Sequence, residues 1–289
     1  MGTDADSRNH TPLRRRLRKW RHRLRNQKRI RSATTNTGII ILLHQMGKVG
    51  SSSIMASLEG MGTCHVFHTH WCNPKNLEHR AGVVDETSRV SNRYGDRDHF
   101  GELVNAQIIQ PGLASKMVTL VRDPVARNVS SYFQHLDEIW GIRRAWSHVP
   151  LSDLTEGFLR IFEHDEPLDW FDTEVRDLVG IDVMKHRFQT DRKFSIMSNE
   201  KWTLLLMRSD LHDDQKQVAL EQLVGTPVPV LQRKNIASKK AYASVYQQFK
   251  RELVLPETYL DRMYKAPVAT HFFDAEEILG MRKRWSRAA

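Results

Sequence analysis

A lysine, two glycines and three consecutive serines occur in the sequence HQMGKVGSSS, directly after the apolar run IIILL. Such a run, rich in β-branched residues and preceded by glycine, predicts a buried strand of a parallel sheet. A glycine-containing turn between a strand and a helix offers backbone N–H groups and the positive end of a helix dipole. Lys48 adds a positive charge and the serines add hydroxyl donors, so the turn predicts a phosphate or sulfate site. The plainer alternative is that the glycines only permit the turn and the serines only cap the helix.

The turn differs from the nucleotide-binding pattern GxxxxGK[ST]. Lys48 is followed by Val49, and the position five before Gly47 is Leu42. The sequence therefore lacks the hydroxyl that holds Mg²⁺ beside the lysine of that pattern. These departures favour an anion bound without a metal ion, and a sulfuryl group suits that requirement.

A second strand-to-helix turn is predicted at RDPVARNVSSY. The apolar run MVTLV at 117–121 predicts a buried strand, which ends at Arg122. Asp123 then has the position of a helix N-cap and Pro124 that of the first helical residue. Strand, tight turn and helix therefore follow one another for the second time.

The two turns resemble the donor site of sulfotransferases that use 3′-phosphoadenosine 5′-phosphosulfate (PAPS). MGKVGSSS resembles their 5′-phosphosulfate loop, and VRDPVARNVSSY is similar to their 3′-phosphate motif. The resemblance implies that Lys48 bridges the 5′-phosphate and the transferring sulfuryl group, and that Arg122 and Ser130 hold the 3′-phosphate. It further implies that a cradle for the 5′-phosphosulfate is formed by Val49, Gly50, Ser51, Ser52 and Ser53. The bland alternatives are a surface lysine, an arginine in a salt bridge and a solvent-facing serine.

The rest of the body looks like bacterial proteins described as capsular polysaccharide synthesis proteins. This resemblance rests on WFDTEVRDLVGIDV, KNIASKKAY and THFFDAEE, and it extends over roughly residues 38 to 280. In LLLMRSDL, Arg208 stands where the sulfotransferase family often has an acidic residue. The resemblance implies transfer of a sulfuryl group from PAPS to a hydroxyl of a glycan or polysaccharide acceptor, with PAPS as donor cosubstrate and no metal.

A general base is needed because the acceptor hydroxyl loses its proton during transfer. His68 and His70 lie in HVFHTHW, at the end of a predicted strand at 65–69 and therefore near the sheet edge of the first turn. We favour His70, which lies further past the strand, over His68. The weaker alternatives are Asp85, Glu86 and Glu102.

The order of elements predicts a three-layer α/β domain with a mostly parallel central sheet, similar to the P-loop-like sulfotransferase fold. The segments KFSIMSN and KWTLLLMRS predict a hairpin or two adjacent strands, and helices are expected at 51–58, 152–162, 170–179 and 210–224. Further helices at 239–252, 256–264 and 274–283 predict a helical C-terminal third. We expect residues 1–37 to form a basic arm and linker, and residues 38–289 to form the sulfotransferase-like domain.

The basic charge of the chain is concentrated in that arm. Residues 13–31 hold eleven Lys and Arg and no acid, which leaves the remainder of the chain at −1 out of an overall +10. Leu13, Leu17, Trp20 and Leu24 have the spacing of an amphipathic helix that lies on anionic lipid. Binding to an anionic polymer such as nucleic acid, or a solvated and partly disordered arm, are the alternatives. No apolar run suits a membrane-spanning helix or a secretory signal, so we expect a cytoplasmic protein that is peripheral at the inner membrane face if the arm binds lipid.

The two cysteines frame a set with metal-ligand chemistry, Cys64, His68, His70 and Cys72. An extended chain would spread these four over roughly 26 Å, so reduced thiols are the default interpretation.

Two other functions remain open. One is a metal-dependent phosphotransferase or nucleotide hydrolase with a degenerate phosphate loop, and the other is a non-catalytic, anion-binding or membrane-associated assembly protein. The sequence predicts neither the acceptor nor the oligomeric state.

Overall fold

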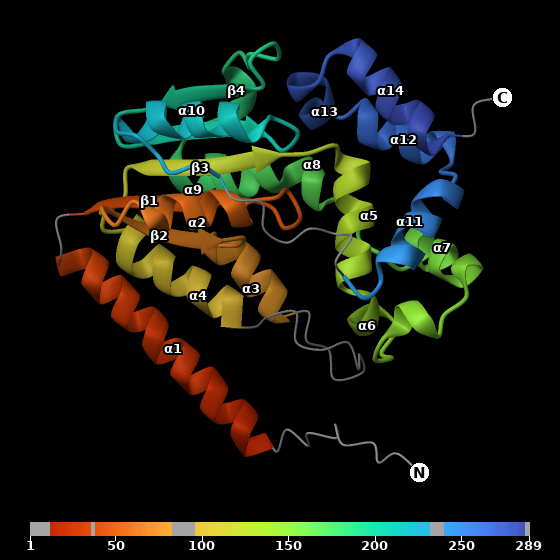
Figure 1. Ribbon diagram of the computed structural model, residues 1–289, viewed down its shortest axis with the longest axis horizontal. Coiled ribbons are helices and arrows are strands. Elements are labelled where there is room, and N and C mark those ends of the chain that lie inside the picture. Colours follow the sequence, from red (N-terminus) through yellow and green to blue (C-terminus); the bar gives the residue numbers. More distant parts are fainter. Residues whose placement is uncertain (1–11, 36–37, 83–95, 232–239, 287–289) are drawn as a thin grey trace.

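The computed structural model describes residues 12–35, 38–82, 96–231 and 240–286. Its centre is a five-stranded sheet with the order β2-β1-β3-β5-β4 (Figure 1). The strands are β1 Ile39–His44, β2 Cys64–Thr69, β3 Lys116–Val121, β4 Phe194–Ser198 and β5 Thr203–Arg208. Neighbouring strands are parallel except β4, which pairs antiparallel with β5. The predictions of a mixed α/β fold, a mostly parallel sheet and a hairpin at its end are thus confirmed.

The strand order creates a switch point between β1 and β3. The chain moves from β1 outward to β2 on one side, and β3 lies on the other side of β1. Ligands of open α/β sheets bind outside the carboxyl ends of the strands at such a point, because the two connections diverge there. The loop that follows β1 and the turn that follows β3 both begin at this edge, and they carry the two predicted anion motifs.

Helices cover the sheet and extend beyond it. α2 and α4 contact β2, and α10 contacts β5. The helices from α1 to α10, with the short helices η1 to η4 between them, belong to the first part and middle of the chain (Figure 1). Their bounds are α1 Pro12–Thr35, α2 Ser52–Gly60, α3 Pro74–Gly82, α4 Asp96–Val104, η1 Asn105–Ile109, α5 Pro124–Gln134, α6 Leu136–Ile139, η2 Ala145–Ser147, α7 Leu151–Arg160, α8 Glu166–Phe171, η3 Asp172–Arg176, α9 Asp177–Val179, η4 Val183–Lys185 and α10 Asp213–Val224.

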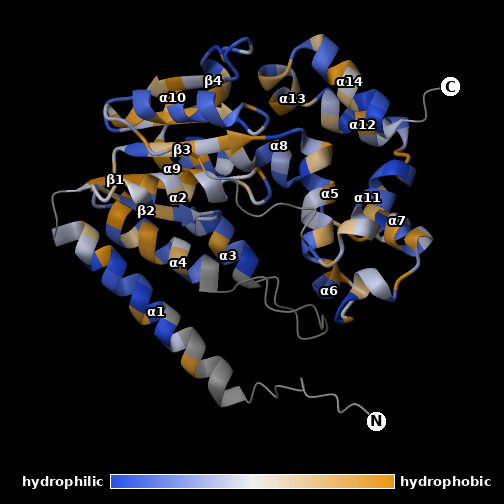
Figure 2. Cartoon of the chain, in the orientation of Figure 1, coloured by the Kyte–Doolittle hydropathy of each residue, from blue (hydrophilic) through white to orange (hydrophobic). Residues whose placement is uncertain are grey.

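The C-terminal part is helical, as predicted, and it packs against α5. It comprises α11 Ala243–Glu252, α12 Glu257–Tyr264, α13 Pro267–Phe272 and α14 Ala275–Trp285. Tyr132 and Phe133 of α5 contact Phe249 of α11, with ring centroids 6.1 and 4.9 Å apart. Apolar residues concentrate in the strands and on the inner faces of the helices (Figure 2), and burial of such side chains stabilises the fold by about 25 cal/mol per Å². The long C-terminal helices are therefore held to the same core as the sheet.

Several local predictions need correction. Ser51 precedes α2, but its side chain makes no capping hydrogen bond. The helix predicted from residue 239 begins at Ala243, and residues 32–35 of the predicted linker belong to α1. The helix expected at 170–179 contains the π-helical turn η3, which has no simple periodic signal. Asp85 and Glu86 lie outside the described residues. Within the described ranges, no helix combines the length and the apolar character needed to cross a membrane.

Candidate anion-binding and active site

The loop after β1 is anchored by Val49, whose side chain is buried in the core. Lys48 and Gly50 on either side of it have φ angles of 74° and 93°. Gly50 tolerates this left-handed region, whereas a lysine in it is uncommon and costs roughly 1 to 2 kcal/mol. The loop therefore holds its lysine in a conformation that local propensity does not favour.

Two arginines from the β3–α5 segment bind the carbonyl groups of this loop. Arg122 Nη1 donates to the Lys48 carbonyl at 2.8 Å, and Arg127 Nε donates to the Gly47 carbonyl at 3.1 Å. Arg127 is buried and also forms an ion pair with Glu166. Because these two carbonyl groups accept hydrogen bonds from arginine, they do not point toward a bound anion. Lys48 and Arg122, far apart in sequence, are thus immediate neighbours.

The start of α5 has the predicted cap. Asp123 Oδ1 accepts hydrogen bonds from the N–H groups of Val125 at 2.9 Å and Ala126 at 3.2 Å. Tyr264 of α12 donates to the same oxygen at 3.0 Å, so the cap also joins the C-terminal helices to the turn. Ser130 is half-buried on α5, about two turns after its start, and no described hydrogen bond joins it to Arg122.

Further positive charges from late in the chain gather around these two residues. Burial, followed by the charges of Lys240 and Arg122, lowers the pKa of Lys48 to about 8. Burial, followed by the charges of Arg122 and Arg284, also lowers the pKa of Lys250. Lowering by a like charge requires proximity, so one cluster is formed by five cations: Lys48, Arg122, Lys240, Lys250 and Arg284. Arg127 also lowers the pKa of Lys48, but it is paired with Glu166 and is not counted among the five. We call them the cation cluster.

The cation cluster has the electrostatics of a polyanion site. Its local carboxylate is Asp123, whose Oδ2 lies 3.9 Å from Arg284 Nη1. Lys48 Nζ donates to the neutral side chain of Gln134 at 2.8 Å. Mutual repulsion destabilises such a cluster when it is empty, and a bound polyanion would relieve that repulsion. The sequence predicted Lys48 and Arg122 as site residues but not the other three cations. Of these three, only Lys240 lies in a stretch quoted for a family resemblance, KNIASKKAY.

His68 near the end of β2 and His70 just after it lie against the same loop. His68 Nε2 lies 3.2 Å from the Ser51 hydroxyl and 3.3 Å from Gln45 Nε2. His70 Nδ1 lies 2.8 Å from the Gln45 carbonyl, so Nδ1 donates to that carbonyl. The two rings are edge to face, with centroids 4.9 Å apart. A donating Nδ1 makes Nε2 the acceptor nitrogen of a neutral His70 ring, which is the tautomer that suits a general base.

A buried carboxylate braces the segment that carries these histidines. Glu174 of η3 is fully buried and accepts hydrogen bonds from the N–H groups of Cys72 and Asn73 at 2.8 and 3.1 Å. It also contacts Nε2 of His44, the last residue of β1, at 3.1 Å. Burial opposes a charged His44 ring, but interactions with Cys72 and Glu174 prevail and raise the pKa of His44 to about 10. Sequence reasoning missed Glu174, although it lies within the quoted stretch WFDTEVRDLVGIDV.

The other predicted residues occupy separate positions. Ser52 and Ser53 form the first turn of α2, where N–H groups lack partners within the helix. Cys64 is half-buried at the start of β2, while Cys72 is buried next to His44. In the described part of the chain, no group of three or more His, Cys, Asp or Glu side chains has the arrangement of a metal site.

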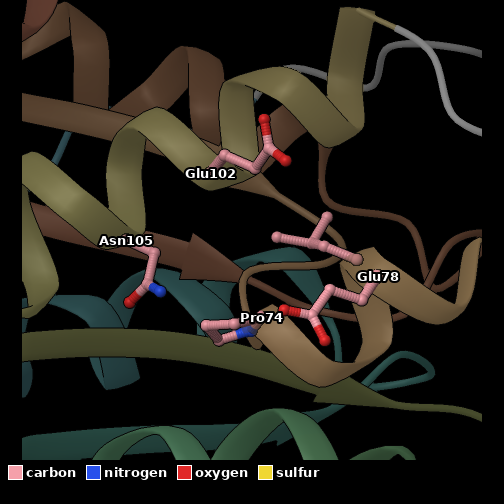
Figure 3. A pocket seen from close by; sticks show the side chains of 5 residues that line it. Pro74, Glu78, Glu102 and Asn105 are labelled. Atoms are coloured by element: carbon pink, nitrogen blue, oxygen red, sulfur yellow. The ribbon is translucent and has the colours of Figure 1, made fainter. Parts of the chain in front are cut away.

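Glu102 lines a cavity of about 330 Å³ between α3, α4 and η1 (Figure 3). The other lining residues are Pro74, Leu77, Glu78 and Asn105. None of them belongs to the cation cluster, and two carboxylates at the wall disfavour a polyanionic ligand. This cavity and the cation cluster are therefore chemically distinct, and a polyanion would suit the cation cluster.

Comparison with known proteins gives one match. A family model described as "Putative capsular polysaccharide synthesis protein" matches residues 156–274. This range includes Glu174, Lys240 and Lys250, and it excludes the loop at Lys48 and the turn at Arg122. No curated protein and no solved structure gives a significant match to the chain. The chain is thus similar, over less than half of its length, to a family named for polysaccharide synthesis.

Proposed function

We propose that this protein is a PAPS-dependent sulfotransferase that transfers a sulfuryl group to a hydroxyl of a glycan or polysaccharide acceptor. The observation that carries the proposal is the cation cluster at the switch point between β1 and β3. PAPS has phosphate groups at both ends of its ribose, which matches positive charge contributed by two adjacent turns. The family match supports a polysaccharide-related acceptor.

In this proposal the two turns divide the donor between them. The N–H groups from Val49 to Ser53 and the start of α2 bind the 5′-phosphosulfate, since helix N-termini favour anions. One N–H of Arg122 donates to the Lys48 carbonyl, and its other N–H groups bind the 3′-phosphate. Ser130 adds a hydroxyl donor to the same phosphate. Lys240, Lys250 and Arg284 supply the remaining countercharge.

The transfer step needs a base and a stabilised leaving group. His70 Nε2 takes the proton of the acceptor hydroxyl while the acceptor oxygen bonds to sulfur and the bond between sulfur and the 5′-phosphate oxygen breaks. Lys48 stabilises the charge that develops on that leaving oxygen, an effect worth roughly 3 to 4 kcal/mol for a well-placed donor. The products are the sulfated acceptor and adenosine 3′,5′-bisphosphate, and positioning and electrostatics account for the catalysis.

Calorimetry with adenosine 3′,5′-bisphosphate tests the donor site. We expect the wild type to prefer this ligand to AMP and to ATP with Mg²⁺, because only the bisphosphate uses both turns. Arg122→Ala removes a charge-assisted phosphate contact and should weaken binding of the bisphosphate about 10- to 100-fold, corresponding to roughly 1.5 to 3 kcal/mol. Binding of AMP, which lacks the 3′-phosphate, should change much less.

Arg187→Ala is the matched control, since Arg187 is exposed and lies outside the cation cluster. It should bind the bisphosphate as the wild type does. Equal weak binding of all three nucleotides by the wild type would end the sulfotransferase proposal. Mg²⁺-dependent preference for ATP would instead support a phosphotransferase or nucleotide hydrolase.

A further inference from the structure

The rear half of α1 is packed against the body. Asn26, Ile30 and Ala33 are buried, and α1 contacts α4 and η1. Arg29 Nη2 donates to the Val66 carbonyl of β2 at 2.8 Å, and its guanidinium lies 5.9 Å from the centroid of the Phe67 ring. This half of the helix is therefore an integral part of the fold.

The front half extends away from the body (Figure 1) and exposes apolar side chains. Leu17, Trp20 and Leu24 are 46%, 59% and 37% exposed. Spacings of three and four place them in one stripe of the helix. At about 100° per residue, this stripe lies roughly 150° around the axis from the packed residues of the rear half. The apolar stripe thus faces away from the protein.

Exposed basic side chains accompany the apolar stripe. Arg21, Arg23, Arg25 and Lys28 are all exposed, and the sequence of α1 contains no acidic residue. Arg21, Arg25 and Lys28 lie on one side of the stripe and Arg23 on the other, by the same helical geometry. Long basic side chains in these positions reach phosphate groups while apolar neighbours enter the acyl boundary.

We propose that the front half of α1 binds the surface of an anionic membrane, with Leu17, Trp20 and Leu24 inserted at the interface. The basic charge of α1 alone would suit a nucleic acid equally well. The sugar-phosphate backbone of a nucleic acid, however, offers no apolar surface to an exposed stripe of two leucines and a tryptophan. A lipid surface engages both features, because Trp favours the membrane interface and basic residues are attracted to anionic headgroups. The packed rear half then couples the folded body to that surface. This inference stands independently of the proposed function.

Vesicle sedimentation with the full chain tests this surface. The wild type should bind vesicles of phosphatidylglycerol and phosphatidylcholine at least about tenfold more tightly than vesicles of phosphatidylcholine alone, and added salt should weaken the binding. The variant with Leu17→Ser, Trp20→Ser and Leu24→Ser should lose about tenfold or more in affinity for the anionic vesicles. It should keep the wild-type midpoint of urea unfolding, which reports an intact body.

A matched control replaces three exposed apolar residues elsewhere, in the variant with Ile142→Ser, Ile161→Ser and Leu279→Ser. It should bind anionic vesicles as the wild type does. The proposal would be overturned if the triple variant of α1 bound anionic vesicles as tightly as the wild type does. It would also be overturned if the wild type bound neutral and anionic vesicles with equal affinity. An RNA oligomer that displaces the protein from vesicles and binds the α1 variant undiminished would also overturn it, in favour of a nucleic-acid arm.

Discussion

At the scale of the residue, Lys48 combines two features that are unfavourable in the empty protein. Its backbone is left-handed, and burial together with neighbouring cations lowers the pKa of its amine to about 8. A bound anion would offset both, since it stabilises the charged amine and accepts hydrogen bonds from the strained loop. Unfavourable features gathered at one residue are typical of a functional site.

The lowered pKa predicts how binding depends on pH. Above about pH 8 the Lys48 amine loses its proton in the empty protein, so affinity for adenosine 3′,5′-bisphosphate should fall by up to about tenfold per pH unit beyond that value. Calorimetry should start above pH 7, because the second ionisation of the phosphates, near pH 6, is then complete.

Lys48→Arg is the informative variant, because a guanidinium stays charged throughout this range. Its affinity should vary less between pH 7 and 9 than that of the wild type, whereas Arg187→Ala should keep the wild-type slope. A wild-type curve that is flat from pH 7 to 9 would show that Lys48 does not titrate against the ligand.

The sequence predicted the two residues that begin the cation cluster because each lies in a recognisable strand-turn-helix pattern. Lys240, Lys250 and Arg284 have no such pattern. Lysine and arginine are common on helix surfaces, and only tertiary packing of the late helices selects these three. The place of His70 after a strand predicts it as a base, whereas its hydrogen bond to the Gln45 carbonyl is a tertiary contact that no local pattern indicates.

At the scale of the element, η3 fixes the segment that follows β2. Glu174 binds two N–H groups of this segment and the ring of His44, and Trp170 Nε1 donates to the His70 carbonyl at 3.2 Å. A loop held at both its amides and its carbonyl keeps the orientation of His70. The apolar runs predicted the strands, since buried parallel strands read as continuous hydrophobic sequence. A buried glutamate in a π-helical turn breaks the usual pattern of burial and could not be predicted in that way.

The His44–Glu174 pair makes a prediction about stability. Burial acts to lower the pKa of His44, but interactions with Cys72 and Glu174 outweigh burial and raise this pKa to about 10 in the folded protein, against an ordinary value of 6.5. This contribution is fully present below pH 6.5 and is lost as the pH rises toward 10, so the free energy of unfolding should fall by about 1 kcal/mol per unit between pH 7 and 8. Three histidines with lowered pKa values, His135, His164 and His271, titrate mainly below this window, and they act in the opposite sense. Lys48, with a pKa of about 8, begins to oppose the slope as the pH nears 8, so the slope is compared between variants that all retain Lys48.

Urea unfolding at pH 7 and pH 8 measures this slope. Glu174→Gln should reduce it and should destabilise the protein by about 3 to 5 kcal/mol, because it removes one partner of a buried pair. Glu156→Gln is the control, since Glu156 and Arg160 form an ion pair in which both side chains are largely exposed. Identical slopes in the wild type and Glu174→Gln would contradict the assignment of a charged His44.

At the scale of the whole molecule, Arg208 connects the sheet to the C-terminal helices. It is buried at the end of β5 and binds Asp210 at 2.8 Å and Glu277 of α14 at 2.5 Å. Its guanidinium also lies 4.4 Å from the centroid of the Phe273 ring. The residue that departs from the family pattern in the sequence therefore has a structural role here, which no local motif could indicate.

Arg208→Leu should affect stability and ligand binding together. We expect a loss of about 1 to 3 kcal/mol in the free energy of unfolding, a figure moderated by the partial exposure of both carboxylates. Affinity for adenosine 3′,5′-bisphosphate should fall about threefold to tenfold, because α14 also carries Arg284 of the cation cluster.

Arg192→Leu provides the comparison, since Arg192 is exposed and its guanidinium lies 4.4 Å from the centroid of the Phe194 ring. Urea unfolding and calorimetry should leave this variant close to the wild type. Unchanged bisphosphate affinity in Arg208→Leu would mean that the position of α14 does not depend on this connection.

The distribution of the cation cluster along the chain has a consequence during translation. Lys48 and Arg122 emerge from the ribosome before Lys240, Lys250 and Arg284. A nascent chain that stalls before residue 240 contains the glycine loop but only two of the five charges. Such a product would hold a polyanion weakly, so strong binding of a polyanion requires translation through residue 284.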